Sequence, residues 1–254
     1  MKKYQAYFID LDGTMYHGDR VIPEAIAFIQ KLNELEIPHL FVTNNSTKTG
    51  EQVAQKLNKM GIMARPEDVF TSSDATVSYM LEQNQVKTVY PIGEVGLKQV
   101  LAENGFEVEE ENPQYVVVGM DMQLTYEKLA KAVLAIRRGA TFISTNADAA
   151  IPTERGLLPG NGSITALVSV ASETKPVVIG KPERVIMDQA LARLGVTKDE
   201  AIMVGDNYET DISAGIHSGM DTLLVLTGFT TRPALQQKAV QPTYVVNDLT
   251  EWEF

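Results

Sequence analysis

The sequence predicts an α/β protein in which parallel sheets are covered by helices. Short apolar runs, each of a length that suits one buried strand, recur along most of the 254 residues. Segments whose apolar residues follow helical spacing lie between most of these runs. Because parallel neighbours must be joined by a crossover, usually a helix, this alternation favours parallel sheets.

The N-terminal elements come first. The range Ala6–Leu11 is predicted to form a buried strand, since apolar side chains occupy both faces of its pleat. Pro23 then begins a helix, and a second strand is expected at Leu40–Thr43. The helix that follows starts near Thr49 and is ended by Gly61. The helix from Pro23 presents one apolar stripe, formed by Ala25, Phe28, Ile29 and Leu32.

Later elements repeat the same alternation. Strands are expected at Thr88–Tyr90, Tyr115–Val118, Thr141–Ile143, Val177–Ile179, Ala201–Val204 and Thr222–Leu226. Helical patterns lie between most of them, and one helix carries its apolar residues on a stripe of Met187, Ala190, Leu191 and Leu194.

Charge and composition exclude several classes of protein. Thirty-three acidic residues against 22 basic ones give a net charge of −11, which disfavours binding to nucleic acid polymers or to anionic membranes. The absence of cysteine excludes disulfide frameworks, thiolate metal sites and a cysteine nucleophile. No apolar run approaches the ~18 residues of a membrane span, and Asp10 and Asp12 interrupt the first apolar stretch before a secretory core forms. We therefore expect a cytoplasmic protein with no membrane partner.

Two carboxylates follow the first predicted strand, in the segment Asp10-Leu11-Asp12-Gly13-Thr14. Ligands of parallel sheets bind beyond the carboxyl ends of the strands, so this segment directs both carboxylates at such a crevice. Neighbouring carboxylates need a cation or a shared proton, and oxygen ligands favour a hard ion such as Mg²⁺. The alternative is a turn at Asp12-Gly13 that Asp10 caps.

A hydroxyl and two amides follow the second predicted strand, in Thr43-Asn44-Asn45-Ser46. Small polar side chains and free backbone amides at a strand end suit the oxygens of a phosphate group. An ordinary loop whose side chains cap a helix explains the same residues, and in isolation this alternative is the stronger one.

A lysine follows the predicted strand Val177–Ile179, in Gly180-Lys181-Pro182. A lysine at a strand end can neutralise phosphoryl charge, and Pro182 suits the first turn of a helix. The segment is not a Walker loop, because proline follows the lysine and the upstream glycine is missing. A lone lysine is also commonly a solvated surface charge.

Two further carboxylates follow the strand predicted at Ala201–Val204. The segment runs from Gly205 and Asp206 through Asn207 to Asp211. Asp206 would meet Asp10 and Asp12 if the two strands are neighbours, and Asp211 lies one helical turn further on. A turn with acidic side chains at a helix N-terminus is the alternative.

In this order, the four segments resemble the four motifs of the haloacid dehalogenase-like superfamily. These motifs are Asp-x-Asp-Gly-Thr, a threonine at a strand end, Gly-Lys-Pro and Gly-Asp-x-x-x-x-Asp. The chain is also similar to the NagD-type phosphatases, which include p-nitrophenyl phosphatase-like proteins. That closer similarity rests on Thr145-Asn146-Ala147-Asp148, Pro159-Gly160-Asn161-Gly162-Ser163 and Gly180-Lys181-Pro182.

The resemblance implies a Mg²⁺-dependent phosphatase that hydrolyses small phosphate monoesters through an aspartyl-phosphate intermediate. Asp10 would attack phosphorus, and Asp12 would protonate the leaving group and then deprotonate the attacking water. Mg²⁺ would bind the Asp10 carboxylate, the Asp12 carbonyl and the Asp206 carboxylate. The residues expected to hold the phosphate group are Thr43, Asn44, Asn45 and Lys181. Asp211 and Asn207 would support the metal-binding and phosphate-binding residues without binding the substrate themselves. In this position, Asp211 would orient Lys181 or a metal-bound water.

The spacing of the motifs implies an inserted domain. Only 32 residues separate Asp10 from Thr43, whereas 137 separate Thr43 from Lys181. We therefore expect a Rossmann-like, parallel-sheet core domain at 1–78 and 176–254, and an inserted α/β cap domain of the C2 type at 79–175.

The cap domain of this family closes over the site and excludes water. Within its glycine- and proline-rich loop at 145–163, Asn146 and Asp148 are expected to set substrate specificity. Formation of a turn by these Asn and Asp side chains is the alternative.

The expected partner is a small phosphorylated metabolite, such as a nucleotide or a sugar phosphate, with aryl phosphates as substrates in vitro. A phosphotransferase or phosphomutase of the same fold and a non-catalytic phosphate-binding protein are the alternatives. The complete set of Asp10, Asp12, Lys181 and Asp206 argues against the binding protein. The sequence indicates no oligomeric state.

Overall fold

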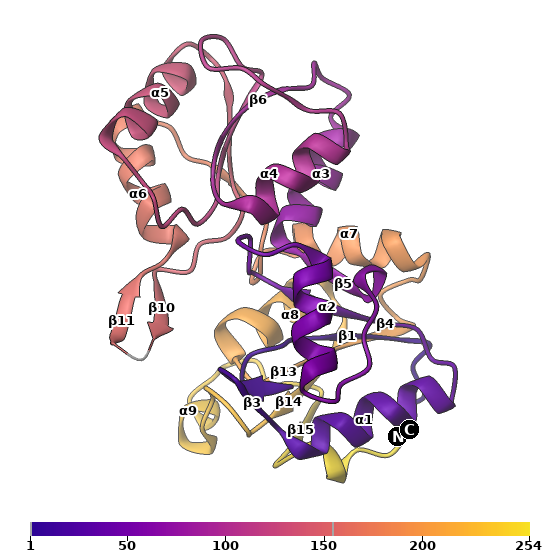
Figure 1. The fold of residues 1–254 in the computed structure, drawn as a ribbon. Coiled ribbons are helices and arrows are strands. Elements are labelled where there is room, and N and C mark those ends of the chain that lie inside the picture. Colours follow the sequence, from indigo (N-terminus) through magenta and orange to yellow (C-terminus); the bar gives the residue numbers. More distant parts are fainter. Residues whose placement is uncertain (1, 154) are drawn as a thin grey trace. The chain divides into compact units, whose positions relative to one another are not determined.

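The computed structural model describes residues 2–153 and 155–254, which form two units (Figure 1). The core unit consists of Met1–Thr43, Gly50–Phe70 and Lys181–Phe254. The inserted unit consists of Asn44–Thr49 and Thr71–Gly180. Each unit has its own sheet and its own hydrophobic core, so the predicted α/β class with an inserted second domain is confirmed.

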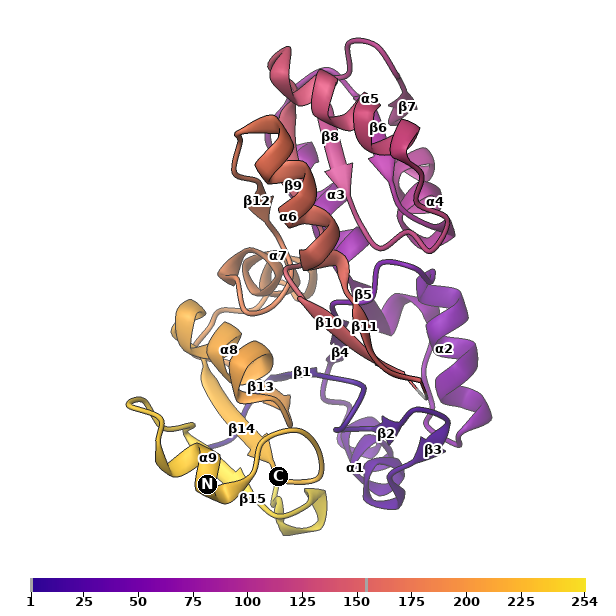
Figure 2. The same cartoon turned by 90° about the vertical axis from the view of Figure 1, so that its left-hand side faces the viewer.

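The core unit is built on a six-stranded sheet in the order β15-β14-β13-β1-β4-β5 (Figure 2). Its strands are β1 (Ala6–Ile9), β4 (His39–Thr43), β5 (Val69–Thr71), β13 (Ala201–Gly205), β14 (Asp221–Val225) and β15 (Tyr244–Val246). Strand β1 pairs in parallel with both β4 and β13. The strands that precede the insertion extend the sheet on one side of β1, and those that follow it extend the other side. Ligands of such sheets bind beyond the carboxyl ends of the strands at this reversal of order.

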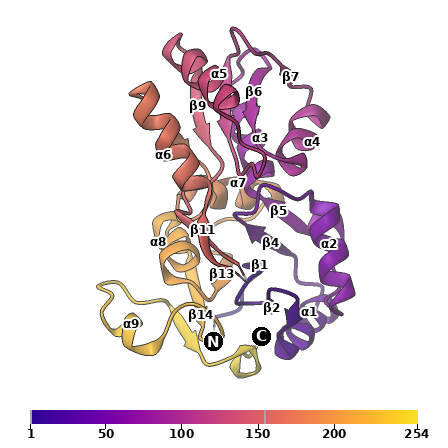
Figure 3. The same ribbon diagram turned by 60° about the vertical axis from the view of Figure 1, so that its left-hand side comes forward.

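Helices cover both faces of the core sheet (Figure 3). The helices α1 (Pro23–Glu34) and α2 (Gly50–Lys59) pack against the β1 side chains Tyr7 and Ile9. The helix α8 (Ser213–Ser218) lies on the opposite face with α7 (Arg184–Leu194) beside it. The predicted stripe of α1 is fully buried at Ala25, Phe28, Ile29 and Leu32, as expected from its spacing.

Short elements complete the core unit. They are β2 (Tyr16–His17), β3 (Arg20–Val21), η1 (Pro66–Asp68), the π-helix η2 (Tyr208–Ile212), α9 (Arg232–Gln236) and η3 (Leu249–Glu251). The C-terminal segment closes the core, because Trp252 is buried and its indole Nε1–H donates a hydrogen bond to the Tyr7 hydroxyl at 3.1 Å. In the described part of the chain, no helix is both long and apolar enough to cross a membrane.

The inserted unit has a five-stranded parallel sheet in the order β12-β9-β8-β6-β7 (Figure 2). Its strands are β6 (Thr88–Ile92), β7 (Glu107–Val108), β8 (Tyr115–Val118), β9 (Thr141–Ser144) and β12 (Val177–Val178). The helices α5 (Tyr126–Arg137) and α6 (Asn161–Ser172) lie side by side and bury apolar residues against β6 and β8. The helices α3 (Ser72–Glu82) and α4 (Val95–Glu103) pack together, and β10 (Ala150–Thr153) forms an antiparallel hairpin with β11 (Gly156–Pro159).

The division between the units falls at different residues from the expected 79 and 175. The inserted unit begins earlier, at Thr71, because α3 packs against α4. It ends later, at Gly180, because β12 joins its sheet by pairing Val177 with Ile143 of β9. The loop Asn44–Thr49 also belongs to the inserted unit by its contacts.

Two local expectations near Lys181 were wrong. The strand at Val177–Val178 does not belong to the core sheet, since its partner is β9 of the inserted sheet. Pro182 does not occupy the first turn of a helix either, because α7 begins at Arg184 with Glu183 as its N-cap. In the predicted stripe of α7, Met187 and Ala190 are fully buried, whereas the two leucines are only half-buried.

Candidate active site

Neighbouring strands bring three carboxylates together in the core unit. Asp10 follows β1 and Asp206 follows β13, and these strands pair in register at Ile9 and Val204. Asp211 lies within the π-helix η2 that comes after β13. One carboxylate oxygen from each of Asp10, Asp206 and Asp211 lies within 4.8 Å of the others. We call these three residues the carboxylate cluster.

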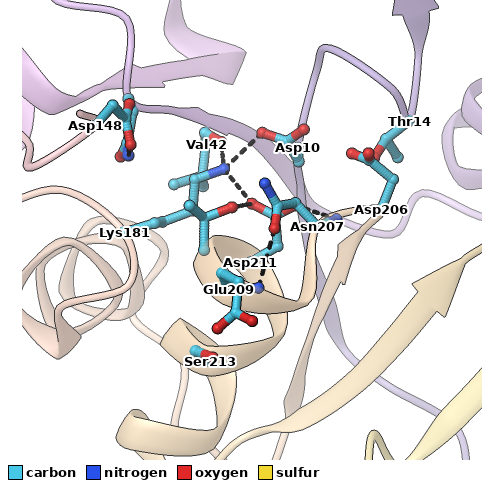
Figure 4. Close-up of polar contacts among 12 residues, drawn as sticks. Asp10, Thr14, Val42, Asp148, Lys181, Asp206, Asn207, Glu209, Asp211 and Ser213 are labelled. Carbon is cyan, nitrogen blue, oxygen red and sulfur yellow. Dashed lines mark hydrogen bonds and ion pairs between the residues drawn. The ribbon is translucent and has the colours of Figure 1, made fainter. Parts of the chain in front are cut away.

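Lys181 supplies a buried ammonium to this cluster (Figure 4). Its Nζ lies 2.6 Å from Asp10 Oδ1 and 2.8 Å from Asp211 Oδ1. It also donates a hydrogen bond of 2.8 Å to the Val42 carbonyl of β4. Burial lowers the pKa of Lys181, but the charges of Asp10 and Asp211 outweigh burial and hold this pKa above its ordinary value. Lys181 is therefore a charged group, fixed by three acceptors, and not a solvated surface lysine.

The carboxylate cluster carries more negative charge than Lys181 can offset. Burial, and next the charge of Asp211, raise the pKa of Asp10 well above its ordinary value. The same two causes raise the pKa of Asp206 to about 6, although hydrogen bonds from Phe229 N–H and the Thr14 hydroxyl oppose the rise. Among the described residues, one ammonium faces three carboxylates. The excess matches a divalent cation in charge, and carboxylate oxygens are the ligands that hard cations prefer, so these residues fit such an ion.

The local backbone places Asp211 beside Lys181. A π-helix is rare and is frequently found at functional sites. Here it turns the Asp211 side chain back toward the end of β13, where the Asn207 backbone N–H donates to Asp211 Oδ2 at 3.1 Å. A side chain at Gly205 would overlap the Asp211 carboxylate, so this position requires glycine. The Asn207 side chain accepts a hydrogen bond from Glu209 N–H and thereby caps the π-helix.

Asp12 lies apart from the carboxylate cluster. It sits in the tight turn after β1, where Gly13 adopts a left-handed φ of 93° and donates its N–H to the Tyr16 carbonyl. Its side chain is exposed, and its carboxylate is not one of the three that come together. The expected metal contact from Asp12 is a backbone carbonyl, which does not require its side chain to join the cluster.

The expected phosphate-binding residues fall in both units. Thr43 is the last residue of β4 and is buried in the core unit. Asn45 accepts hydrogen bonds from the backbone N–H groups of Thr47 and Lys48 at 2.8 and 3.2 Å. These contacts match the alternative in which the Asn45 side chain shapes a loop. Asn44 belongs to the inserted unit, and its side chain contacts Asp148 of the same unit.

Asn44 joins the two expected specificity residues within the inserted unit. Its side-chain amide donates to both carboxylate oxygens of Asp148, at 3.2 and 3.3 Å. The Asn146 side chain donates to the Asn44 carbonyl at 2.9 Å and accepts from the Asp148 backbone N–H at 3.1 Å. Asn44 and two residues that lie about a hundred positions further along the chain thus form one hydrogen-bonded group.

Asn161, to which the sequence assigned no site role, is hydrogen-bonded to the loop that carries Asn146. Its side-chain amide lies 2.9–3.2 Å from four acceptors, which are Val118 O, Ser144 Oγ, Thr145 Oγ1 and Asn146 O. A side chain at Gly160 would overlap the backbone of Asp148, and one at Gly162 would overlap the backbone of Ala147. We call Asn161 with Ser144, Thr145 and Asn146 the amide network. The segment Pro159-Gly160-Asn161-Gly162 supports the resemblance to the family, but its sequence does not indicate the hydrogen bonds that Asn161 makes.

Comparisons with known proteins show the family of this chain. A family model described as haloacid dehalogenase-like hydrolase matches residues 7–107, and one described as HAD-hydrolase-like matches residues 178–252. The 5'-nucleotidase YutF of Bacillus subtilis is 54% identical over 252 residues, which is 99% of this chain and 98% of that protein. An acid sugar phosphatase of Staphylococcus aureus is 56% identical over 99% of this chain and 97% of its own length. The crystal structure of a single mutant of a thermostable NPPase from Geobacillus stearothermophilus matches with a TM-score of 0.94 and 55% identity, covering 100% of both chains.

Proposed function

Because the chain belongs to the haloacid dehalogenase-like hydrolases, in their NagD and p-nitrophenyl phosphatase family, we propose that it is a Mg²⁺-dependent phosphatase that uses Asp10 as its nucleophile. The observation that carries this proposal is the Lys181 ammonium, joined to Asp10 at 2.6 Å inside the carboxylate cluster. Its substrates are small phosphate monoesters, as with the related nucleotidase and sugar phosphatase.

Asp10 carries out the first displacement. Its carboxylate oxygen forms a bond to phosphorus as the bond between phosphorus and the ester oxygen breaks, which gives an aspartyl-phosphate. The contact between Lys181 and Asp10 Oδ1 fixes the orientation of the carboxylate before the attack. Lys181 also offsets the negative charge that accumulates when two anions approach each other.

Asp12 moves the proton in both steps. It gives a proton to the leaving alkoxide in the first step and takes one from water in the second. The second step forms a bond between water oxygen and phosphorus, breaks the Asp10–phosphorus bond and releases inorganic phosphate. The exposed side chain of Asp12, two residues from the nucleophile on a fixed turn, suits exchange with both substrate and water.

Asp10 and Asp206, with the Asp12 carbonyl, would hold Mg²⁺. When bound, the ion would supply positive charge that screens the substrate from the carboxylates. Asp211 keeps Lys181 in place through its contact of 2.8 Å, and Thr43 and the Asn44 backbone amide bind phosphoryl oxygens.

Asn146 and Asp148 set specificity in this proposal. Both lie on the loop after β9. The Asn44 side chain donates to the Asp148 carboxylate, and the Asn146 side chain is held by the Asn44 carbonyl and the Asp148 backbone N–H. A side chain that is oriented in advance discriminates between leaving groups better than a mobile one.

The test compares two identical substitutions nine positions apart. Asp10→Asn removes the nucleophile, whereas Asp19→Asn changes a fully exposed aspartate of the same unit. With p-nitrophenyl phosphate and Mg²⁺, we expect Asp10→Asn to lose about 10³-fold or more in kcat and Asp19→Asn to retain wild-type turnover. We expect chelation of divalent cations to abolish wild-type turnover and added Mg²⁺ to restore it. Full turnover by Asp10→Asn would refute the proposed nucleophile.

A further inference from the structure

The Asp206 carboxylate accepts hydrogen bonds from two loops of the core unit. From the turn after β1, the Thr14 hydroxyl donates to Asp206 Oδ1 at 3.2 Å. From the loop after β14, the Phe229 backbone N–H donates to Asp206 Oδ2 at 2.6 Å. Asp206 is only 3% exposed, so its orientation is set by these contacts and not by solvent. A carboxylate offers about four acceptor positions, and two hydrogen bonds leave positions for a cation.

Close approach of the second loop depends on a residue without a side chain. A Cβ at Gly228 would overlap Asp206 Oδ2 and Cγ. The φ angle of Gly228 lies outside the left-handed region, so its glycine is explained by space and not by backbone conformation. Gly13 approaches the same carboxylate from the opposite loop, and a Cβ there would also overlap Asp206. Two glycines thus flank one carboxylate.

The loop after β14 is anchored at both of its ends. Before Gly228, the Thr227 hydroxyl donates to the Gly13 carbonyl at 2.7 Å, which ties this loop to the turn that contains Asp12. After Phe229, the Thr230 backbone N–H donates to the Asp206 carbonyl at 3.1 Å. Thr230 Oγ1 also accepts a hydrogen bond of 2.8 Å from the Tyr208 N–H at the start of the π-helix. These bonds connect the three segments that carry Asp12, Asp206 and Asp211.

We propose that the segment Thr227-Gly228-Phe229 is a positioning element that holds the Asp206 carboxylate in the orientation needed to bind the divalent cation. Phe229 contributes its backbone N–H, Gly228 contributes space, and Thr227 links the segment to the turn after Asp10. This proposal rests on the proposed function, because it assigns the role through the cation that the phosphatase reaction requires. None of the three residues needs to touch the substrate.

The test uses Gly228→Ala with Gly215→Ala as its matched control. Gly215 lies in α8, where a Cβ would overlap the Thr222 side chain but no residue of the carboxylate cluster. Both substitutions therefore introduce a buried methyl group that overlaps its neighbours, but only Gly228→Ala displaces Asp206. The readouts are the dissociation constant of Mg²⁺ by calorimetry in the absence of substrate, and the Mg²⁺ concentration that gives half of the maximal turnover.

We expect Gly228→Ala to raise both quantities by at least about tenfold, as loss of a group that supports a metal ligand usually does. Gly215→Ala is expected to lower the unfolding temperature and to leave both quantities within about twofold of wild type. Equal Mg²⁺ affinity in Gly228→Ala and wild type would overturn the proposal. So would an equal loss of affinity in both variants, because that result would indicate general destabilisation.

A second pair of variants decides the outcome if Gly228→Ala does not fold. Thr227→Val removes the hydroxyl with little change in shape, and Thr227→Ser retains it. We expect Thr227→Val to weaken Mg²⁺ binding several-fold and Thr227→Ser to bind Mg²⁺ like wild type. Unchanged Mg²⁺ binding in Thr227→Val would contradict the role of this segment. If wild type itself neither binds Mg²⁺ nor requires it for turnover, the proposed function fails instead, so the two failures are distinguishable.

Discussion

The core unit and the inserted unit both place polar side chains at the ends of parallel strands, but the two sets differ in charge. The carboxylate cluster follows β1 and β13 and sets three acids against the single ammonium of Lys181. The amide network follows β9 and consists of neutral groups that bond to one another. Neutral buried groups can satisfy each other, whereas an excess of carboxylates requires a cation. The difference indicates that the core unit carries the chemistry and that the amide network maintains the shape of a loop.

The largest expected effect comes from removing the positive charge of the core unit. Lys181→Met leaves the carboxylates of Asp10 and Asp211 buried without their partner, and breaking a buried ion pair in this way costs about 3–5 kcal/mol. We expect the free energy of unfolding in urea to fall by about this amount and turnover of p-nitrophenyl phosphate to be lost. Lys198→Met, at an exposed position, serves as the control. Wild-type stability in Lys181→Met would show that the ammonium does not hold the cluster together.

The next effect depends on pH. The pKa of Asp206 in the folded protein is about 6, above its ordinary value of 3.8. The protonated carboxyl group therefore contributes its full stabilisation below pH 3.8, and this stabilisation is lost as the pH rises through about 6. Asp206→Asn removes the charge responsible for this loss. Without divalent cations, we expect the variant to exceed wild type in free energy of unfolding by about 1–3 kcal/mol at pH 8 and to show no gain at pH 4.

Two controls accompany the Asp206 measurement. Asp199→Asn, at an exposed position, is expected to show no such pH dependence. Added Mg²⁺ stabilises wild type at pH 8 and cancels the advantage of Asp206→Asn, because the ion then offsets the excess charge. A wild-type protein that is more stable than the variant at pH 8 without cations would mean that the carboxylates do not repel one another.

A smaller effect is expected in the amide network. Asn161→Asp preserves the shape of the side chain but removes the amide that lies between four acceptors. Loss of a buried donor costs about 1–3 kcal/mol, and burial of the new carboxyl group beside these acceptors adds to that cost, so thermal unfolding should shift to lower temperature. Asn112→Asp makes the same change at an exposed position and should have little effect. If Asn161→Asp instead abolished kcat with an unchanged fold, the amide network would have to take part in the chemistry.

The smallest effect concerns specificity. Asp148→Asn keeps the contacts with Asn44 possible but removes the negative charge from the loop. We expect the ratio of kcat/KM values for a sugar phosphate and p-nitrophenyl phosphate to change several-fold, while kcat for the aryl ester changes little. The measurement is a panel of phosphate esters ranked by kcat/KM. Proportional changes across the whole panel would remove Asp148 from the specificity residues.

The sequence predicted the long-range features of this site better than its local ones. The rule that parallel strands share a ligand-binding edge predicts the meeting of Asp10 with Asp206, because both follow apolar runs that form neighbouring strands. The strand before Lys181 was assigned to the wrong sheet, since a two-residue strand has no pattern that distinguishes one sheet from another. Strands β5 and β15, of three residues each, were not predicted.

The contacts that sequence patterns cannot indicate are mostly those made by the backbone. Phe229 donates a hydrogen bond to Asp206 through its backbone N–H, a group that nearly every residue has. The residue type at position 229 therefore cannot predict this contact. Gly228 could in principle be noticed, but a glycine after a strand is usually explained by a turn. Asn161 has a suitable side chain, yet its acceptors lie on two segments, at the ends of β8 and β9, that only the folded sheet brings together.

The most direct test of the account is the identity of the residue that becomes phosphorylated during turnover. Wild-type protein is mixed with Mg²⁺ and p-nitrophenyl phosphate, quenched in acid within one turnover, digested and examined by mass spectrometry. We predict one phosphoryl group on the peptide that contains Asp10, released by hydroxylamine as expected for an acyl phosphate. A phosphoryl group on any other residue, or rapid turnover with no phosphorylated peptide, would contradict the account.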